Sequence, residues 1–145
     1  MPAPAATIQD LFAYGSLMCE DIMATVAGAR FHGTPAVLAG YRRFLVKGEQ
    51  YPGVVAVANG TVAGMVYRNI SQKGWLRLDR FEGAMYNRTP VTVLFDNKTE
   101  GLVHCYLFRP EFFDRLTSTE WEYDTFLRGG KTLFQNRYGG FKAID

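Results

Sequence analysis

The order of the predicted elements is the feature that most limits the folds open to this chain. Runs rich in β-branched and aromatic residues predict strands near residues 8–14, 35–38, 43–47, 53–58, 61–67, 90–95 and 102–108. Helical spacing of apolar residues occurs in three places, at 17–28, at 72–83 and from Thr117 to Gly129-Gly130. Strands therefore outnumber helices and follow one another directly, whereas a Rossmann fold needs alternating βαβ units and a glycine fingerprint. The sequence predicts an α+β fold, with a small mixed, mostly antiparallel curled sheet or barrel and flanking helices.

Turn and cap signals refine this prediction. Asn59-Gly60 lies between two β-branched runs and predicts a hairpin there. Asp96-Asn97-Lys98 predicts a second hairpin between the last two strands. Thr117 and Glu120 have the spacing of a capping box, so the late helix is expected to begin at Thr117, and Trp121 is expected in the core.

Size and composition exclude several classes of protein. The 145 residues suit one domain spanning 1–145, with residues 1–7 as a flexible tail that lacks the features of a secretory signal. The net charge of +2 argues against nucleic-acid binding driven by electrostatics, and no apolar run approaches the roughly 20 residues of a membrane span. Cys19 and Cys105 are too few for a disulfide framework or a zinc site, and His32 and His104 lack the spacing of metal ligands. We therefore expect free thiols, no metal and a cytoplasmic protein.

The first candidate site is the segment Tyr14-Gly15-Ser16-Leu17, where a predicted strand runs into a predicted helix. Free backbone N–H groups at a helix start bind anions, and a glycine lets a ligand approach the backbone closely. The segment is interpreted as a cradle for a carboxylate or an oxyanion. The alternative is an ordinary turn in which Ser16 caps the helix.

The second candidate is Glu82. On a helical wheel Trp75, Leu78 and Glu82 share one apolar stripe, so a carboxylate stands where leucine is expected and Gly83 stops the helix after it. A buried carboxylate is costly unless it is paired or protonated, so Glu82 is expected to have a raised pKa and to serve a function in a pocket. The alternative is a structural glutamate paired with Arg88 or a backbone amide.

Two further segments are candidate pocket walls. Tyr86 lies four residues beyond Glu82 and is expected to flank the same pocket, unless it only packs in the sheet. Tyr51-Pro52-Gly53 precedes a strand and is either another wall or an ordinary Pro-Gly turn.

In this order the segments resemble the γ-glutamylcyclotransferase-like family, also called AIG2-like or butirosin-biosynthesis-type cyclotransferases. The resemblance rests on FAYGSLM at 12–18, EQYPGVV at 49–55, VAGMVY at 62–67, LRLDRFEGAMYNRTPVTV at 76–93 and HCYLF at 104–108. It implies a small mixed barrel with flanking helices and release of 5-oxoproline from γ-glutamyl amines. The family pattern assigns glutamyl binding to Tyr14, Gly15, Ser16 and Leu17 and acid/base catalysis to Glu82, and it matches Tyr86 to the tyrosine after the EG pair.

The implied reaction needs no cofactor, because the attacking amine and the carbonyl belong to one small-molecule substrate. The identity of that γ-glutamyl amine and the oligomeric state stay open, and residues 110–145 carry no substrate information. Two other classes also remain: a non-catalytic module that binds γ-glutamyl or similar small carboxylate ligands, and an interaction domain in which Glu82 only satisfies Arg88.

Overall fold

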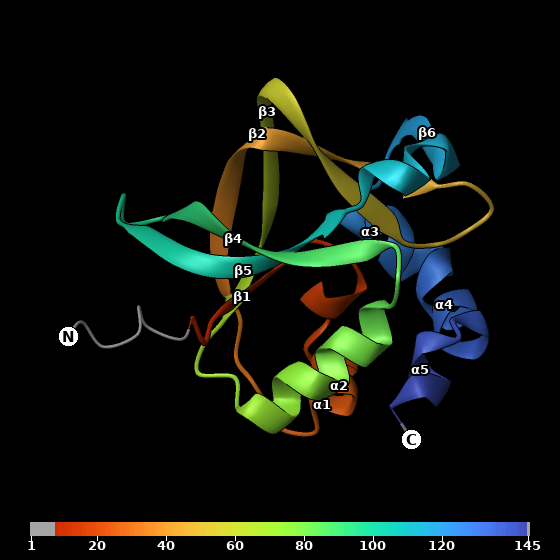
Figure 1. The fold of residues 1–145 in the computed structure, drawn as a ribbon, viewed down its shortest axis with the longest axis horizontal. Coiled ribbons are helices and arrows are strands. Elements are labelled where there is room, and N and C mark those ends of the chain that lie inside the picture. Colours follow the sequence, from red (N-terminus) through yellow and green to blue (C-terminus); the bar gives the residue numbers. More distant parts are fainter. Residues whose placement is uncertain (1–7, 145) are drawn as a thin grey trace.

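The computed structural model describes residues 8–144, so the predicted tail at 1–7 lies outside the described residues. Six strands form one sheet in the order β3-β1-β5-β4-β2-β6, and an added β2–β3 pairing closes five of them into a barrel (Figure 1). Among the strands of residues 8–144, β1 and β5 pair in parallel and the other pairs are antiparallel. The predicted fold class is confirmed. The strands are β1 (Leu11–Ala13), β2 (Thr34–Val46), β3 (Pro52–Tyr67), β4 (Tyr86–Phe95), β5 (Glu100–Phe108) and β6 (Leu116–Glu120).

The Asn59-Gly60 hairpin prediction is wrong, because both residues lie inside the continuous strand β3. The register between β2 and β3 shifts here, so that residues 57–60 of β3 face only Gly40 of β2. Asn59 has a φ of 64° and Gly40 a φ of 86°, conformations that asparagine and glycine tolerate in bulges as well as in turns. The pair therefore bends a long strand, which lets β2 and β3 curve around the barrel, and residues 47–51 connect the two strands.

The other strand predictions need smaller changes. The segments at 35–38 and 43–47 belong to one strand, β2, rather than two. The hairpin at Asp96-Asn97-Lys98 is confirmed between β4 and β5, and Lys98 takes up a positive φ there. Strand β4 begins at Tyr86, four residues earlier than predicted.

Two helices cover one end of the barrel, α1 (Glu20–Ala27) and α2 (Gln72–Glu82), and they pack against each other below it in Figure 1. The prediction for α2 is confirmed: the Ser71 side chain caps its start by accepting from the Gly74 N–H at 3.0 Å. Helix α1 starts later than predicted, because residues 16–18 form a separate 3-10 turn and Cys19 follows it.

The capping-box prediction at Thr117 is wrong, since Thr117 lies in β6. Its hydroxyl donates to the carbonyl of Leu45 at 2.8 Å, and Glu120 pairs with Arg42, so the sheet uses both groups that a capping box would need. The C-terminal helical segment follows, with α3 (Tyr123–Thr125), a π-turn at Phe126–Gly130, α4 (Lys131–Arg137) and α5 (Gly140–Ala143). It packs on one side of the barrel (Figure 1), and Trp121 is buried as expected.

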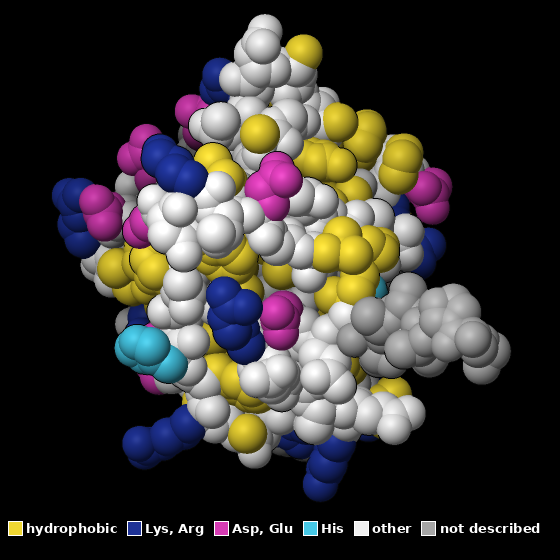
Figure 2. Space-filling view, turned by 90° about the vertical axis from the view of Figure 1, so that its left-hand side faces the viewer, with side chains coloured by type: hydrophobic (Ala, Val, Ile, Leu, Met, Phe, Trp, Pro, Cys, Tyr) yellow, Lys and Arg dark blue, Asp and Glu magenta, His cyan; other side chains and the backbone are white. Residues whose placement is uncertain are grey.

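The core has two parts, and β1 separates them. Leu11 and Ala13 face the helices, whereas Phe12 and Tyr14 face the barrel interior, which is the two-residue alternation of a strand. Cys19 and Cys105 are both buried and free. No helix among residues 8–144 is long and apolar enough to cross a membrane. On the face in Figure 2, lysine and arginine side chains lie interspersed with aspartate and glutamate.

Candidate active site

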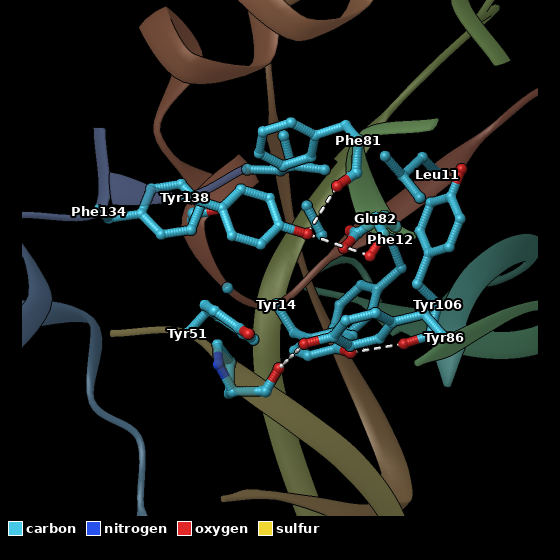
Figure 3. A pocket seen from close by; sticks show the side chains of 15 residues that line it. Leu11, Phe12, Tyr14, Tyr51, Phe81, Glu82, Tyr86, Tyr106, Phe134 and Tyr138 are labelled. Atoms are coloured by element: carbon cyan, nitrogen blue, oxygen red, sulfur yellow. Dashed lines mark hydrogen bonds between the residues drawn. The ribbon is translucent and has the colours of Figure 1, made fainter. Parts of the chain in front are cut away.

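One pocket lies where the end of β1, the end of α2 and the C-terminal segment meet (Figure 3). Its volume, counted together with the open solvent at its mouth, is about 410 Å³. All six sequence-predicted site residues line it. The lining residues are Leu11, Phe12, Ala13, Tyr14, Gly15, Ser16, Leu17, Tyr51, Pro52, Phe81, Glu82, Tyr86, Tyr106, Phe134 and Tyr138.

Side-chain hydrogen bonds to its backbone carbonyl groups hold the loop at 14–17 in place. The Arg43 guanidinium donates to the Tyr14 carbonyl at 2.7 Å, and the Tyr67 hydroxyl donates to the carbonyls of Leu17 at 2.6 Å and Met18 at 3.1 Å. Within the described chain, no acceptor takes a hydrogen bond from the N–H groups of residues 15–17. Gly15, Ser16 and Leu17 all line the pocket, so the loop brings donors without a protein partner to its wall.

Contrary to the prediction from the sequence, the loop at 14–17 is not the start of an α-helix. Ser16 caps no helix with its side chain, so the capping alternative is not observed. Helix α1 begins at Glu20, so its dipole does not end at the loop. Unpaired N–H groups of the loop itself, rather than a helix dipole, are thus the donors that this segment offers.

Two tyrosines are fixed beside this loop. The Tyr14 hydroxyl donates to the Tyr106 carbonyl, and the Tyr86 hydroxyl donates to the Pro52 carbonyl at 2.8 Å. Burial raises the pKa of both phenols well above their usual value. Both rings are thus neutral, immobilised walls whose remaining oxygen lone pairs can still accept a hydrogen bond.

Glu82 is the last residue of α2, and Gly83, with a φ of 82°, ends the helix after it. No other described residue donates a hydrogen bond to its carboxylate or forms an ion pair with it. Burial raises its pKa from 4.5 to about 8, and the nearby negative charge of Asp79 adds to this effect. Among the fifteen lining residues of the described chain it is the one charged side chain.

The Arg88 alternative for Glu82 is wrong. The Arg88 Nε lies 3.0 Å from the Asp79 Oδ1, so Asp79 and not Glu82 takes this cation. Asp79 also accepts from the Tyr106 hydroxyl at 2.7 Å, and Arg88 stacks 4.6 Å from the ring centroid of Trp75. This pairing satisfies Arg88 outside the pocket and leaves Glu82 without a counter-charge.

The sequence reasoning attributed the burial of Glu82 to Trp75 and Leu78, but neither lines the pocket. Its walls come mainly from aromatic residues of other elements. Tyr51 and Pro52 lie in the wall, as one of the two interpretations proposed. Four lining residues, Phe81, Tyr106, Phe134 and Tyr138, were not predicted from the sequence.

Of the four lining residues that were not predicted, only Phe134 and Tyr138 had a recognisable pattern in the sequence. Phe134 and Tyr138 are four residues apart, a spacing that places two aromatic rings on one helix face. Tyr106 lies in a strand of alternating residues and nothing in the sequence sets it apart. Among residues 8–144, no three histidine, cysteine, aspartate or glutamate side chains gather as metal ligands.

The model of the family "Gamma-glutamyl cyclotransferase, AIG2-like" matches residues 11–123. The chain belongs to this family. The resemblance read from the sequence motifs is confirmed.

Relatives in this family include plant proteins. AIG2-like protein C of Arabidopsis thaliana is 30% identical over 136 residues, which cover 88% of this chain and 79% of the relative. A solution structure of another Arabidopsis thaliana protein matches with a TM-score of 0.71 at 27% identity, covering 94% of this chain and 82% of that one. A solved gamma-glutamyl cyclotransferase matches with a TM-score of 0.62 at 18% identity over 69% of this chain and 66% of its own, a likeness of fold.

The family match and the pocket do not cover the same residues. Thirteen of the fifteen lining residues fall within 11–123, whereas Phe134 and Tyr138 come from the C-terminal segment beyond it. In this chain the family core is therefore completed by a wall from outside the matched region.

Proposed function

We propose that the protein is a γ-glutamylcyclotransferase, which releases 5-oxoproline and a free amine from a γ-glutamyl amine. The observation that carries this proposal is the unpaired Glu82 carboxylate, with a pKa near 8, in the same pocket as the loop at 14–17, whose residues 15–17 have unpaired N–H groups. Family membership supports the reaction class. The residues proposed for glutamyl binding are Tyr14, Gly15, Ser16, Leu17 and Tyr86.

The first task of the site is to fold the substrate. The loop N–H groups bind oxygen atoms of the glutamyl part, and the fixed rings of Tyr14 and Tyr86 leave little space around it. The substrate's α-amine then lies against its own γ-carbonyl. Well-oriented intramolecular attack of this kind reaches effective molarities of about 10⁵–10⁸ M, so holding the folded conformation supplies much of the rate.

The second task is to move protons from the attacking nitrogen to the leaving nitrogen. The α-ammonium gives one proton to the Glu82 carboxylate, and the neutral amine attacks the γ-carbonyl carbon to form the ring. Glu82 passes that proton to the leaving nitrogen as the bond between carbon and leaving nitrogen breaks. The second proton of the ammonium follows the same route, so the amine departs as a cation and Glu82 is regenerated.

The raised pKa of Glu82 suits this transfer. A carboxylate of ordinary pKa, near 4.3, is a poor base toward an α-ammonium whose pKa is about 8. At about 8, Glu82 and the substrate amine are matched, so the proton moves between them at almost no cost in free energy. Desolvation of the carboxyl among the aromatic walls is the main cause of this match.

The developing negative charge on the γ-carbonyl oxygen also needs stabilisation. The unpaired N–H groups of residues 15–17 are preorganised donors for it, because Arg43 and Tyr67 hold the loop in place from behind. Donors from the backbone depend little on the side chain at position 16. Ser16→Ala is therefore expected to lower turnover only modestly.

The test is incubation of the protein with γ-glutamyl amino acids, γ-glutamyl-ε-lysine and glutathione, followed by an assay for 5-oxoproline. Release from at least one substrate, at a rate proportional to enzyme concentration, supports the proposal. Binding of these compounds without release would instead identify a non-catalytic binding module. Neither binding nor release would return the pocket to a structural role.

A further inference from the structure

The partly exposed residues of the pocket mark its mouth. Eleven of the fifteen lining residues are buried, and the four that keep partial exposure are Gly15, Tyr51, Glu82 and Tyr138. The cavity thus opens to solvent between the loop, the start of β3 and the C-terminal segment. A substrate whose glutamyl part lies on the loop extends its amine substituent toward this opening.

The opening carries a wall of aromatic rings. Tyr51 and Tyr138 meet edge to face with ring centroids 5.1 Å apart, and Phe134 stacks on Tyr138 at 4.9 Å with an interplanar angle of 16°. In Figure 3 Tyr138 and Phe134 lie on one side of Glu82, and Tyr86 and Tyr106 lie on the other. The same three residues also line a second cavity, which is completed by residues 48–50 and by other residues of α4.

Tyr138 is fixed relative to the proposed acid/base group. Its hydroxyl donates to the carbonyls of Phe81 at 2.6 Å and Glu82 at 3.1 Å, which are end groups of α2 without a partner further along the helix. Gly140 packs directly on the Phe81 carbonyl, where any Cβ would collide with that oxygen. The wall and Glu82 therefore keep one relative position.

We infer that the wall of Tyr51, Phe134 and Tyr138 receives the leaving-amine part of the substrate and selects amines that carry a flat apolar group near the nitrogen. This inference rests on the proposed function and names the amine class that the site prefers. Flat groups stack on or against aromatic rings, and such pairs add to the gain from burying apolar area. Tyr138 is then a specificity-determining residue supplied from outside the region that the family model matches.

The test compares two substrates that differ only in the amine, γ-glutamyl benzylamide and γ-glutamyl methylamide. For the wild type we expect kcat/KM to be on the order of tenfold higher for the benzylamide. Tyr138→Ala should reduce this ratio to near one, mainly through the benzylamide KM. Leu127→Ala changes an exposed side chain in the same C-terminal segment that does not line the pocket, and it should leave the ratio unchanged.

Tyr138→Phe separates the ring from its hydroxyl. It keeps the flat wall but removes the hydrogen bonds to the end of α2, so turnover of both substrates should fall by a similar factor while their ratio stays high. If Tyr138→Ala does not fold, as judged by circular dichroism, Tyr138→Leu takes its place, because leucine fills similar space without a flat face.

Two failures can be told apart. If the wild type turns over both amides equally, or if Tyr138→Ala keeps the wild-type ratio, the inference about the wall is wrong and the cyclotransferase proposal stands. If the wild type releases 5-oxoproline from neither amide nor from the wider panel of γ-glutamyl compounds, the proposed function fails and the inference fails with it.

Discussion

Replacing Glu82 by glutamine should stabilise the protein, and the gain should grow as the pH rises. The native pocket raises the pKa of Glu82 from 4.5 to about 8, so between these values the native state keeps a proton that the unfolded chain has released. Stability from this group is present below about pH 4.5 and is lost as the pH rises toward about 8. Glutamine is neutral throughout and avoids this loss.

The size of the effect follows from the shift. One pKa unit corresponds to about 1.4 kcal/mol, so the whole shift amounts to about 5 kcal/mol of unfolding free energy. Most of it, about 4 kcal/mol, falls between about pH 5 and about pH 9. Relative to wild type, Glu82→Gln is thus expected to be close to neutral at the lower pH and strongly stabilised at the higher one.

Urea unfolding of both proteins at about pH 5, 7 and 9 measures this difference, and other titrating groups largely cancel in it. Glu111→Gln removes an exposed carboxylate outside the pocket and supplies the baseline. A difference between Glu82→Gln and wild type that stays flat across this range would refute the claim that burial perturbs Glu82.

Three further predictions concern the surroundings of the pocket. Asp79→Asn removes the negative charge that adds to the raised pKa of Glu82, so the limb of the pH–rate profile that reports Glu82 should move to lower pH; an unmoved limb would contradict this assignment. Tyr67→Phe leaves the carbonyls of Leu17 and Met18 without their donor, so the free energy of unfolding measured in urea should fall by about 1–2 kcal/mol. KM should rise more than kcat falls, and an unchanged KM would argue against the loop as the glutamyl site. Gly60→Ala places a Cβ against a carbonyl of β2 and should destabilise the protein by about 2 kcal/mol or more. Gly129→Ala, whose Cβ meets open space, should change stability by less than about 1 kcal/mol. Equal thermal melts of the two variants would show that β3 does not need its bend.

The parts of the structure that the sequence predicted well are those fixed by local pattern. Helix α2 has a cap at Ser71 and a stop at Gly83, and its apolar stripe sets which face is buried. The turn at 96–98 and the α+β class likewise follow from residues near one another in the chain. Glu82 stood out because a carboxylate occupied an apolar position of the helix. That position is visible in the local sequence, but the pocket that explains it is built from residues far apart in the chain.

The wrong or missed predictions concern residues whose structure is decided by partners far away in the sequence. Asn59-Gly60 has the local chemistry of a turn, but pairing with β2 across the barrel makes it a bend. Thr117 has the chemistry of a cap, yet its hydroxyl finds a carbonyl of β2 instead. Tyr138 reaches the pocket only because the chain returns to the end of α2 after 56 residues, a contact that no short-range pattern encodes.

The most direct test of the central claim measures turnover and binding in one preparation of Glu82→Gln. The substrate is whichever γ-glutamyl amine the wild type converts, and the binding ligand is 5-oxoproline, followed by calorimetry. Glutamine keeps the shape of the side chain but accepts no proton, so 5-oxoproline release should fall by about 10²–10⁴ while the affinity for 5-oxoproline changes little. Near-normal release by Glu82→Gln, with the variant folded, would contradict the acid/base role of Glu82.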